Sequence, residues 1–258
     1  MSNLVVLNNE KISKKNNKFY SRNFNFKILP EGLNKFFNVQ YIARKSNTDE
    51  HHELNLQSVK IASNIIQFIY YVLSTFKNKN TRYYIISITP YTFIAFLFLF
   101  LFWKKVFVYL ISSGYEEWKY ILGSWAVWIY HIMFSIVTSN STVIALHERL
   151  YRKKDGYVIE SSTLNKDWLQ NFKKPNLNKI KLLNVSRVNP EKGIFEFLEM
   201  FKKLEIDAEI SIIGKIKNLK LKNRFKSIIQ NNSNIIFPGY VSDRKLLIDT
   251  YDNHNILI

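Results

Sequence analysis

The chain has 258 residues, of which 47% are hydrophobic, so it is long enough for two modest globular domains with buried cores. It contains no cysteine, which excludes a disulfide framework and any metal site built from thiolates. The formal net charge of +17 attracts anions such as nucleic acid, an anionic membrane surface or phosphorylated substrates. Because Lys, Asn and Ile are all abundant, compositional drift is the alternative explanation for this charge.

The first two thirds of the chain are predicted to alternate between strands and helices. No secretory signal is indicated, because the first apolar run is followed at once by polar residues. Strands are predicted at Leu4–Leu7, Val39–Ile42, Tyr83–Ile88, Val106–Leu110, Ser135–Thr138 and Tyr157–Ile159. Helices are predicted at Phe26–Phe37, Leu54–Phe76 and Pro90–Trp103, from the loop Ser112–Glu117 to about Phe134, and at Ser141–Leu150, and Arg44–Glu53 is predicted to be exposed. This alternation predicts a parallel sheet covered by helices.

The segment Pro90–Trp103 carries no charge and is followed directly by Lys104 and Lys105. It is shorter than the roughly 20 apolar residues that a membrane-spanning helix needs. A buried helix is the preferred interpretation, and insertion into the membrane interface or a true span are the alternatives. We therefore expect a soluble or peripherally bound protein.

The composition of Lys173–Asn178 is typical of a linker, which predicts a first domain of residues 1–172 and a second of residues 173–258. Beyond the linker the alternation of strands and helices begins again. Strands are predicted at Ile180–Val185, Ala208–Ile213, Ile235–Phe237 and Ile256–Ile258, and helices at Ile194–Leu204, Leu219–Ile229 and, with Ser242 as N-cap, through Tyr251. The predicted fold class is α/β, with two domains built on parallel sheets.

The segment Arg187–Gly193 (RVNPEKG) combines several features of a phosphate site. It lies between a predicted strand and a predicted helix, and ligands of open α/β sheets bind at the carboxyl ends of the strands. The helix N-terminus offers free N–H groups, Arg187 and Lys192 add two cations, and Gly193 permits close approach of the backbone. Two cations suit a diphosphate better than a monophosphate. A basic turn without a ligand is the alternative, and Glu191 could pair with either cation.

Three stretches of this region resemble the C-terminal domain of the GT4-type glycosyltransferases, also called glycosyl transferases group 1. They are KLLNVSRVNPEKGIFEFLEMFKKL, ISIIGK and NIIFPGYVSDRKLLIDTYDNHNILI, and they keep the family's order and spacing. The resemblance implies a GT-B-like fold, with two Rossmann-like domains containing parallel sheets. It also implies transfer of a sugar from a nucleotide-diphosphate sugar, with retention of configuration at the anomeric carbon.

The resemblance further implies that Arg187 and Lys192, with Gly193 beside them, hold the diphosphate of the donor. Enzymes of this type usually need no metal, because helix dipoles and basic side chains neutralise the leaving diphosphate. We therefore expect no metal and no cofactor besides the donor itself. No catalytic residue is identified by the sequence.

Gly239, Tyr240 and Val241 match the turn that the family places beside the nucleotide base, and Gly214 matches the glycine that closes the second strand. In the family, the next strand leads to a Pro-Ser turn and a glutamate pair, E-x7-E, that holds ribose and sugar hydroxyls. The sequence ends at Ile258, before that position. A C-terminally truncated chain with an incomplete second domain is therefore expected.

The first domain resembles the acceptor domain of the family less specifically. A candidate acceptor loop contains Gly114 and Glu116, at the end of a predicted strand. Glu116 and Glu117 could bind acceptor hydroxyls, or they could simply begin the following helix, where acidic residues favour the helix dipole. The second interpretation is preferred.

Two classes of function are therefore compared. The first is a glycosyltransferase, cytoplasmic and bound peripherally at the inner membrane face, that acts on a cell-envelope glycan or a lipid-linked saccharide in polysaccharide biosynthesis. The second is a non-enzymatic basic module that binds an anionic membrane or nucleic acid. The net charge of +17 favours the second class, but the sequence lacks a basic–aromatic RNA signature and a recognition-helix pattern.

Overall fold

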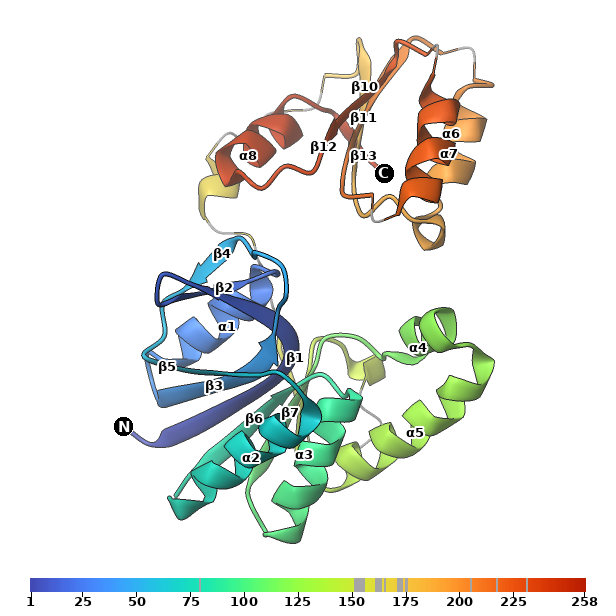
Figure 1. Cartoon of the computed structure of the whole chain (residues 1–258). Helices are drawn as coiled ribbons and strands as arrows, with labels where there is room; N and C mark the ends of the chain where they lie inside the picture. Colours follow the sequence, from blue (N-terminus) through green and yellow to red (C-terminus); the bar gives the residue numbers. More distant parts are fainter. Residues whose placement is uncertain are drawn as a thin grey trace. The chain divides into compact units, whose positions relative to one another are not determined.

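The computed structural model describes residues 1–78, 80–150, 156–160, 164, 166–170, 174, 176–204, 206–216, 218–230 and 232–258 (Figure 1). The chain divides into two compact units, Met1–Thr163 and Leu164–Ile258. The predicted boundary between residues 172 and 173 lies outside the described residues. Each unit is described separately below.

The first unit is built on a nine-stranded sheet. Its strands are β1 (Asn3–Lys15), β2 (Lys18–Ser21), β3 (Asn38–Lys45), β4 (His52–Leu54), β5 (Ser58–Ala62), β6 (Arg82–Ile86), β7 (Val106–Leu110), β8 (Thr142–Ala145) and β9 (Gly156–Val158). The strands pair in the order β5, β3, β1, β6, β7, β8, β9, and all of these pairs are parallel. β2 and β4 extend the sheet by antiparallel pairing from the second half of β1. The predicted parallel sheet is confirmed, with an antiparallel addition.

β1 is much longer than its predicted apolar core Leu4–Leu7, because it continues into a hairpin with β2. The hairpin turn consists of Asn16 and Asn17, which both have positive φ (48° and 61°). Two such residues form the turn that best matches the twist of an antiparallel hairpin. The Lys-rich flanks of this turn carry no apolar alternation, so the sequence pattern did not indicate a strand.

The prediction of one helix over Leu54–Phe76 is wrong. Val59 and Ile61 lie in β5, and the helix α2 begins only at Ile65 and ends at Ser74. Asn64 is its N-cap, and its side chain accepts a hydrogen bond from the amide of Gln67 at 2.9 Å. Apolar residues two apart suit a strand as well as a helix, and the cap residue marks the true start.

Two further predictions in this unit are wrong. Ser135–Thr138, predicted as a strand, forms the end of the helix α5 (Ser124–Ser139), where Val137 packs in the core. Ser141–Leu150, predicted as a helix, contains β8 and a short 3₁₀ turn. The long predicted helix after the loop is broken at Gly123 (φ 93°) into α4 (Tyr115–Leu122) and α5. Tertiary packing overrides β propensity at the end of α5.

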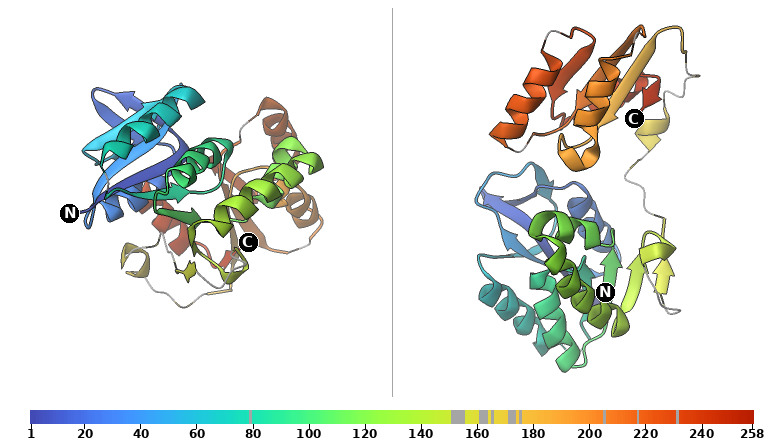
Figure 2. Two further views of the ribbon diagram at one scale, coloured as in Figure 1. Left: turned by 90° about the horizontal axis from the view of Figure 1, so that it is seen from below. Right: turned by 90° about the vertical axis from the view of Figure 1, so that its right-hand side faces the viewer.

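Three helices lie side by side over one face of this sheet, in the order α2, α3 (Pro90–Leu101) and α5, as both Figure 1 and the view from below in Figure 2 show. They bury residues such as Phe68, Phe96 and Phe134 against the strands. The opposite face is covered in part by α1 (Asn25–Leu33). Pro90–Trp103 is thus mainly helical, as predicted, and buries one side only. Within the described part of the chain, no helix has both the length and the apolar character required to cross a membrane.

The second unit is a four-stranded sheet in the order β12, β11, β10, β13, with all pairs parallel. The strands are β10 (Ile180–Val185), β11 (Ala208–Ile213), β12 (Ile235–Gly239) and β13 (Ile256–Leu257), and the helices are α6 (Ile194–Phe201), α7 (Leu219–Ile229) and α8 (Arg244–Asp252). α6 and α7 cover one face and α8 lies on the other (Figure 1). The predicted elements of this unit are confirmed, apart from shifts of a few residues at some ends.

Candidate functional site

The candidate site lies at the carboxyl edge of the sheet in the second unit. From β10 the chain crosses to β11 and then to β12 on one side, whereas β13 pairs with the opposite side of β10. This reversal creates a topological switch point between β10 and β13, where the turns after neighbouring strands diverge. Ligands of open α/β sheets bind in the crevice at such a point.

Backbone hydrogen bonds hold three turns together at this edge. The amide of Ser186, after β10, donates to the carbonyl oxygen of Ile213 at the end of β11 (3.0 Å). The amide of Gly214 in turn donates to the carbonyl oxygen of Gly239 at the end of β12 (3.0 Å). The structure therefore places the segment after β10, the Gly214 turn and the Gly239 turn along one edge, because the carboxyl ends of parallel strands lie at the same edge of a sheet.

The two predicted phosphate-binding cations are both exposed on the segment between β10 and α6. Neither Arg187 nor Lys192 has an ion-pair partner among the residues that the structure describes. Gly193 has φ of 68° and open space where a Cβ would stand, and no side chain caps the N-terminus of α6 that follows it. Two unpaired cations beside an uncapped helix N-terminus form a suitable environment for a phosphate group.

Asn189 is a residue of this segment that the sequence interpretation missed. Its side chain is buried, and its Nδ2 donates a 2.8 Å hydrogen bond to Oε1 of Glu191. Its carbonyl oxygen accepts from the amide of Lys192 at 3.0 Å. Asn189 therefore fixes the shape of the turn and gives the Glu191 carboxylate a neutral partner. Asn directly before Pro is a turn signal that could have indicated this role.

The other two turns each contain a glycine, and the physical reason for glycine differs between them. A Cβ at Gly214 would overlap the carbonyl oxygen of Ser186, so glycine is required there by the close approach of two turns. Gly239 has φ of 88° and no atom near the position of a Cβ, so its backbone is open to a ligand. Tyr240 is exposed and Val241 half-buried beside it. The N-cap of α8 is Asp243, whose Oδ1 accepts from the amide of Leu246 at 2.8 Å, and the prediction of Ser242 as N-cap is wrong.

Two polar side chains border the switch point on the β13 side. Nδ2 of Asn184 donates to the carbonyl oxygen of Ile258 (3.1 Å), and Oγ of Ser186 donates to Oδ1 of Asn184 (2.8 Å). Both residues are half-buried where β10 ends. The sequence interpretation did not select them, although polar residues that end an apolar strand are a usable signal for a site at its carboxyl edge.

In the first unit, the candidate acceptor loop follows β7. Gly114 has φ of 74°, and a Cβ there would overlap the ring of Tyr130, so its identity follows from packing. Glu116 and Glu117 are exposed in the first turn of α4. That position is where carboxylates favour the helix dipole, and contact with an acceptor stays a prediction.

Glu10 lies in β1, within the irregularity where the register of the parallel pairing with β3 shifts between Leu7 and Lys11. Its Oε1 is buried and has no hydrogen-bond partner among the described residues. Burial raises the pKa of Glu10 to about 7, and the nearby Arg22 opposes the increase. Bulges and perturbed carboxyl groups occur preferentially beside functional sites, so Glu10 is an acid–base candidate that the sequence did not indicate.

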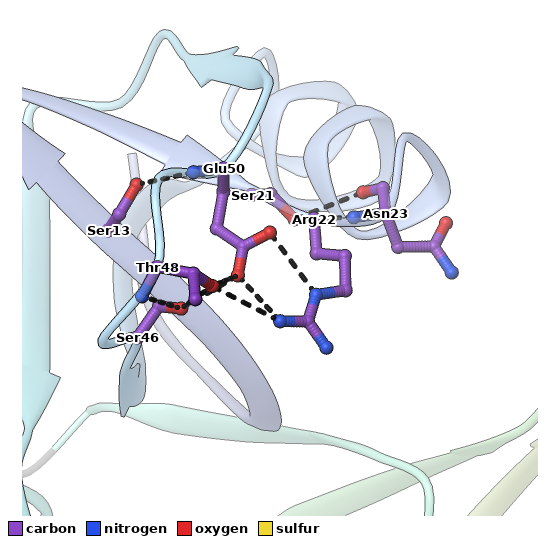
Figure 3. Close-up of polar contacts among 7 residues, drawn as sticks. All are labelled: Ser13, Ser21, Arg22, Asn23, Ser46, Thr48 and Glu50. Carbon is purple, nitrogen blue, oxygen red and sulfur yellow. Dashed lines mark hydrogen bonds and ion pairs between the residues drawn. The ribbon is translucent and has the colours of Figure 1, made fainter. Parts of the chain in front are cut away.

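A polar cluster beside Glu10 stabilises the hairpin (Figure 3). Arg22 donates from Nε and Nη2 to the two carboxylate oxygens of Glu50 (3.2 and 2.9 Å), and Oγ of Ser46 donates to Oε1 at 2.7 Å. Burial would raise the pKa of Glu50, but the hydrogen bonds from Arg22 and Ser46 outweigh it, so the pKa is lowered. Glu50 and Ser46 are buried, so the prediction that Arg44–Glu53 is exposed is wrong at these two residues.

Within the described residues, no group of three or more His, Asp or Glu side chains is arranged to hold a metal ion. The expectation that the chemistry needs no metal stays a prediction, because it rests on the resemblance and not on this observation. The candidate site at the carboxyl edge of the second sheet consists of the cations Arg187 and Lys192, the glycine turns and the N-terminus of α6.

Comparison with known protein families gives one match in the second unit. Residues 166–258 match the family described as "Glycosyl transferases group 1". This region contains the whole candidate phosphate site. No curated protein matches the sequence significantly.

Solved structures similar to this chain cover both units. HepE from Anabaena in complex with UDP aligns with 96% of this chain and 71% of its own, at a TM-score of 0.61 and 12% identity. MurG from Acinetobacter baumannii aligns with 95% of this chain and 68% of its own, at a TM-score of 0.54 and 8% identity. The UDP-GlcNAc 2-epimerase from Methanocaldococcus jannaschii aligns with 98% of this chain and 77% of its own, at a TM-score of 0.54 and 12% identity. At these identities the likeness shows the fold, which is α/β and GT-B-like, with Rossmann-like units built on parallel sheets.

Proposed function

We propose that this protein is a glycosyltransferase that takes a sugar from a nucleotide-diphosphate donor held at the carboxyl edge of the second unit. The supporting observation is the pair of exposed cations, Arg187 and Lys192, before the uncapped N-terminus of α6 at the switch point of the sheet. The same region matches the family of glycosyl transferases group 1. The family match favours group transfer over simple phosphate binding.

In this proposal the diphosphate occupies the turn between β10 and α6. The Arg187 guanidinium has donors arranged to bind two phosphate oxygens, and Lys192 supplies a compact charge. The first N–H groups of α6 follow directly on this turn, and Gly193 leaves room for the phosphate to approach the backbone. These groups stabilise the negative charge that develops on the leaving diphosphate, so no metal is required for that role. Transfer with retention of configuration, as in GT4-type enzymes, is part of the proposal.

The nucleotide base is proposed to lie beside the Gly239 turn. Gly239 presents an open backbone at φ of 88°, and the exposed Tyr240 offers a ring on which a base can stack. Val241 completes this turn before α8 begins. Backbone N–H and C=O groups can hydrogen-bond to the base without charged side chains, and Gly239, Tyr240 and Val241 carry none.

The acceptor is proposed to be a cell-envelope glycan or a lipid-linked saccharide, reached from the cytoplasmic face of a membrane. Gly114 and Glu116, at the carboxyl end of β7, form the candidate acceptor loop. This loop follows the carboxyl end of a parallel strand, which is where ligands of α/β sheets bind. The excess of positive charge suits an anionic membrane surface.

Binding of UDP, GDP and ADP to the full chain, measured by isothermal titration calorimetry, tests the proposal. Arg187→Ala and Lys192→Ala should each weaken binding of the preferred diphosphate by at least about tenfold, because each removes a charge-assisted hydrogen bond. Lys226→Ala is the matched control, since Lys226 is an exposed cation in the last turn of α7, away from the carboxyl edge. The control should bind as the wild type does.

Equal affinity in all four proteins would contradict the site. Salt-dependent binding of an oligonucleotide, without any response to nucleoside diphosphates, would instead support the basic binding module. Transfer itself is tested afterwards with labelled nucleotide sugars and membrane extracts, and its product shows the anomeric configuration by NMR.

A further inference from the structure

The three helices that cover one face of the first unit contain no Asp, Glu, Lys or Arg. α2 (IIQFIYYVLS), α3 (PYTFIAFLFLFL) and α5 (SWAVWIYHIMFSIVTS) are uncharged throughout their length. A surface helix of a water-soluble protein normally carries charged residues on its outer side. The outer side of this layer therefore lacks the property that suits a helix to water.

Large apolar side chains occupy that outer side. Ile66 of α2 is 79% exposed and Trp128 of α5 is 69% exposed, although each helix buries its other side in the core. α3 lies between these helices, and its exposed residues include Leu101. Exposed apolar side chains are ordinary when scattered, but a charge-free layer of three neighbouring helices marks an interaction surface. Trp125 and Tyr70 are exposed on the same helices.

Trp103 is the most exposed large aromatic residue of this region, at 93%. It follows α3 in the left-handed conformation (φ 54°), and the amide of Lys104 then donates to the carbonyl oxygen of Leu99 at 2.9 Å. This position after a helix is normally taken by Gly or Asn, because a bulky side chain is strained there. Trp103 is unfavourable in this conformation and its side chain is not buried in the core, so contact with an external partner is the better explanation for it.

Cations surround the end of this layer. Arg82, Lys104 and Lys105 line a shallow pocket together with Phe102 and Trp103. Nζ of Lys104 lies 4.9 Å from the centre of the Phe76 ring, and Phe76 is followed by the exposed Lys77. From Leu54 to Tyr115 the sequence contains no Asp or Glu. An apolar surface with a rim of unopposed positive charge is complementary to a bilayer that contains anionic lipids.

We propose that the outer side of α2, α3 and α5, with Trp103 at its edge, is the surface by which this protein binds an anionic lipid bilayer. The aromatic and aliphatic side chains enter the headgroup region, and Lys77, Arg82 and Lys105 contact lipid phosphates. Self-association fits less well, because a second copy of this surface has no Asp or Glu on α2, α3 or α5 to pair with the cations. The inference deepens the peripheral location included in the proposed function, but its test needs no donor or acceptor.

Flotation of the full chain with lipid vesicles tests the proposal. We compare vesicles of phosphatidylcholine alone with vesicles of phosphatidylcholine and phosphatidylglycerol in equal parts, and we expect much stronger binding to the second. Trp103→Gly should reduce binding by about tenfold, because one fully exposed aromatic anchor is lost. The same variant should fold at least as well as the wild type, because glycine relieves the left-handed strain. Loss of binding therefore cannot be attributed to unfolding.

The other variants separate the apolar and the electrostatic contributions. Ile66→Gln and Trp128→Gln should weaken binding to both kinds of vesicle. Lys77→Gln and Lys105→Gln should each lower binding to the phosphatidylglycerol vesicles alone, by about fivefold. Leu219→Gln is the matched control, because Leu219 is an exposed apolar residue of α7 in the second unit, and it should bind as the wild type does.

Three results would overturn the proposal. They are absence of the wild type from the floating fraction, unchanged binding of Trp103→Gly and Trp128→Gln, or a wild-type dimer in solution that these two variants convert to monomers. Failure of the glycosyltransferase proposal is distinguished by the nucleotide titrations, since Trp103→Gly should keep the wild-type affinity for the diphosphate. If the protein binds vesicles but no nucleoside diphosphate, the membrane-binding proposal stands and the glycosyltransferase proposal is wrong.

Discussion

Glu10 shows how one buried carboxyl group makes stability depend on pH. Its pKa is raised by burial from 4.5 to about 7 in the folded chain. A carboxyl group with a raised folded pKa contributes stability below its unfolded pKa, and this contribution is lost as the pH increases from 4.5 to about 7. Above this range the buried charge costs on the order of 2 kcal/mol, after allowance for its partial exposure.

Glu10→Gln keeps the shape of the side chain and removes the titration. We expect the variant to exceed the wild type in free energy of unfolding by on the order of 2 kcal/mol at about pH 8, and to match it near pH 4. Urea unfolding at the two pH values measures this difference. A difference of equal size at both pH values would show that the carboxyl group is not titrating between them. Glu31→Gln, at a carboxylate that already has Lys27 as partner at 2.7 Å, should not reproduce the gain at high pH.

The sequence indicated some site residues and could not indicate others. Arg187, Lys192 and Gly193 follow one another in a short segment after an apolar strand, so local pattern and helix electrostatics sufficed to select them. Asn189 was missed because its importance comes from its burial. Glu10 was missed because the burial that raises its pKa arises only in the folded chain.

At the scale of elements, the N-cap of α8 is a test of the turn beside the proposed base site. Oδ1 of Asp243 accepts from the amide of Leu246, whereas Ser242 is exposed one residue earlier. Asp243→Ala should lower the free energy of unfolding by about 1 kcal/mol, because one helix amide loses its partner. Ser242→Ala should change it by less than about 0.5 kcal/mol. Thermal unfolding followed by circular dichroism compares the two variants, and equal losses would mean that both side chains share the cap.

The elements of the second unit were predictable because each strand is a short apolar run bounded by turn residues. β10, β11 and α7 begin and end where the pattern places them. In the first unit, the segment from Leu54 to Phe76 contains a strand and a helix, β5 and α2, with few breaks in apolar character. Periodicity alone does not separate the two structures in such a segment, because the residues at two-residue spacing also satisfy part of a helical pattern.

At the scale of the whole molecule, the two units have separate hydrophobic cores. The core clusters of the first unit draw on residues from Leu4 to Leu150, and the cluster of the second on residues from Leu182 to Ile235, with no shared member among the described residues. The sequence predicted two parallel sheets, but it did not predict the hairpin of β1 and β2 that enlarges the first. That hairpin depends on a turn of two asparagines, in a segment whose many Lys and Asn residues indicate a loop.

Separate cores lead to a prediction about unfolding of the full chain. We expect two calorimetric transitions, because chains with independent cores depart from two-state behaviour. A nucleoside diphosphate at about a hundred times its Kd should stabilise only the transition of the second unit, by about 2.7 kcal/mol, since it binds the folded state of that unit alone. Arg187→Ala should reduce this shift to about 1.4 kcal/mol or less at the same ligand concentration, because its affinity for the diphosphate is expected to be at least about tenfold lower.

Glu10→Gln identifies the other transition. At about pH 8 it should raise the midpoint of the transition that does not respond to nucleotide, because Glu10 lies in the first unit and its ionised carboxylate is destabilising there. A single transition that moves with both the ligand and the Glu10 substitution would show that the units unfold cooperatively. In that case the stability of the donor site would depend on the first unit as well, and substitutions in the two cores would no longer act independently on diphosphate affinity.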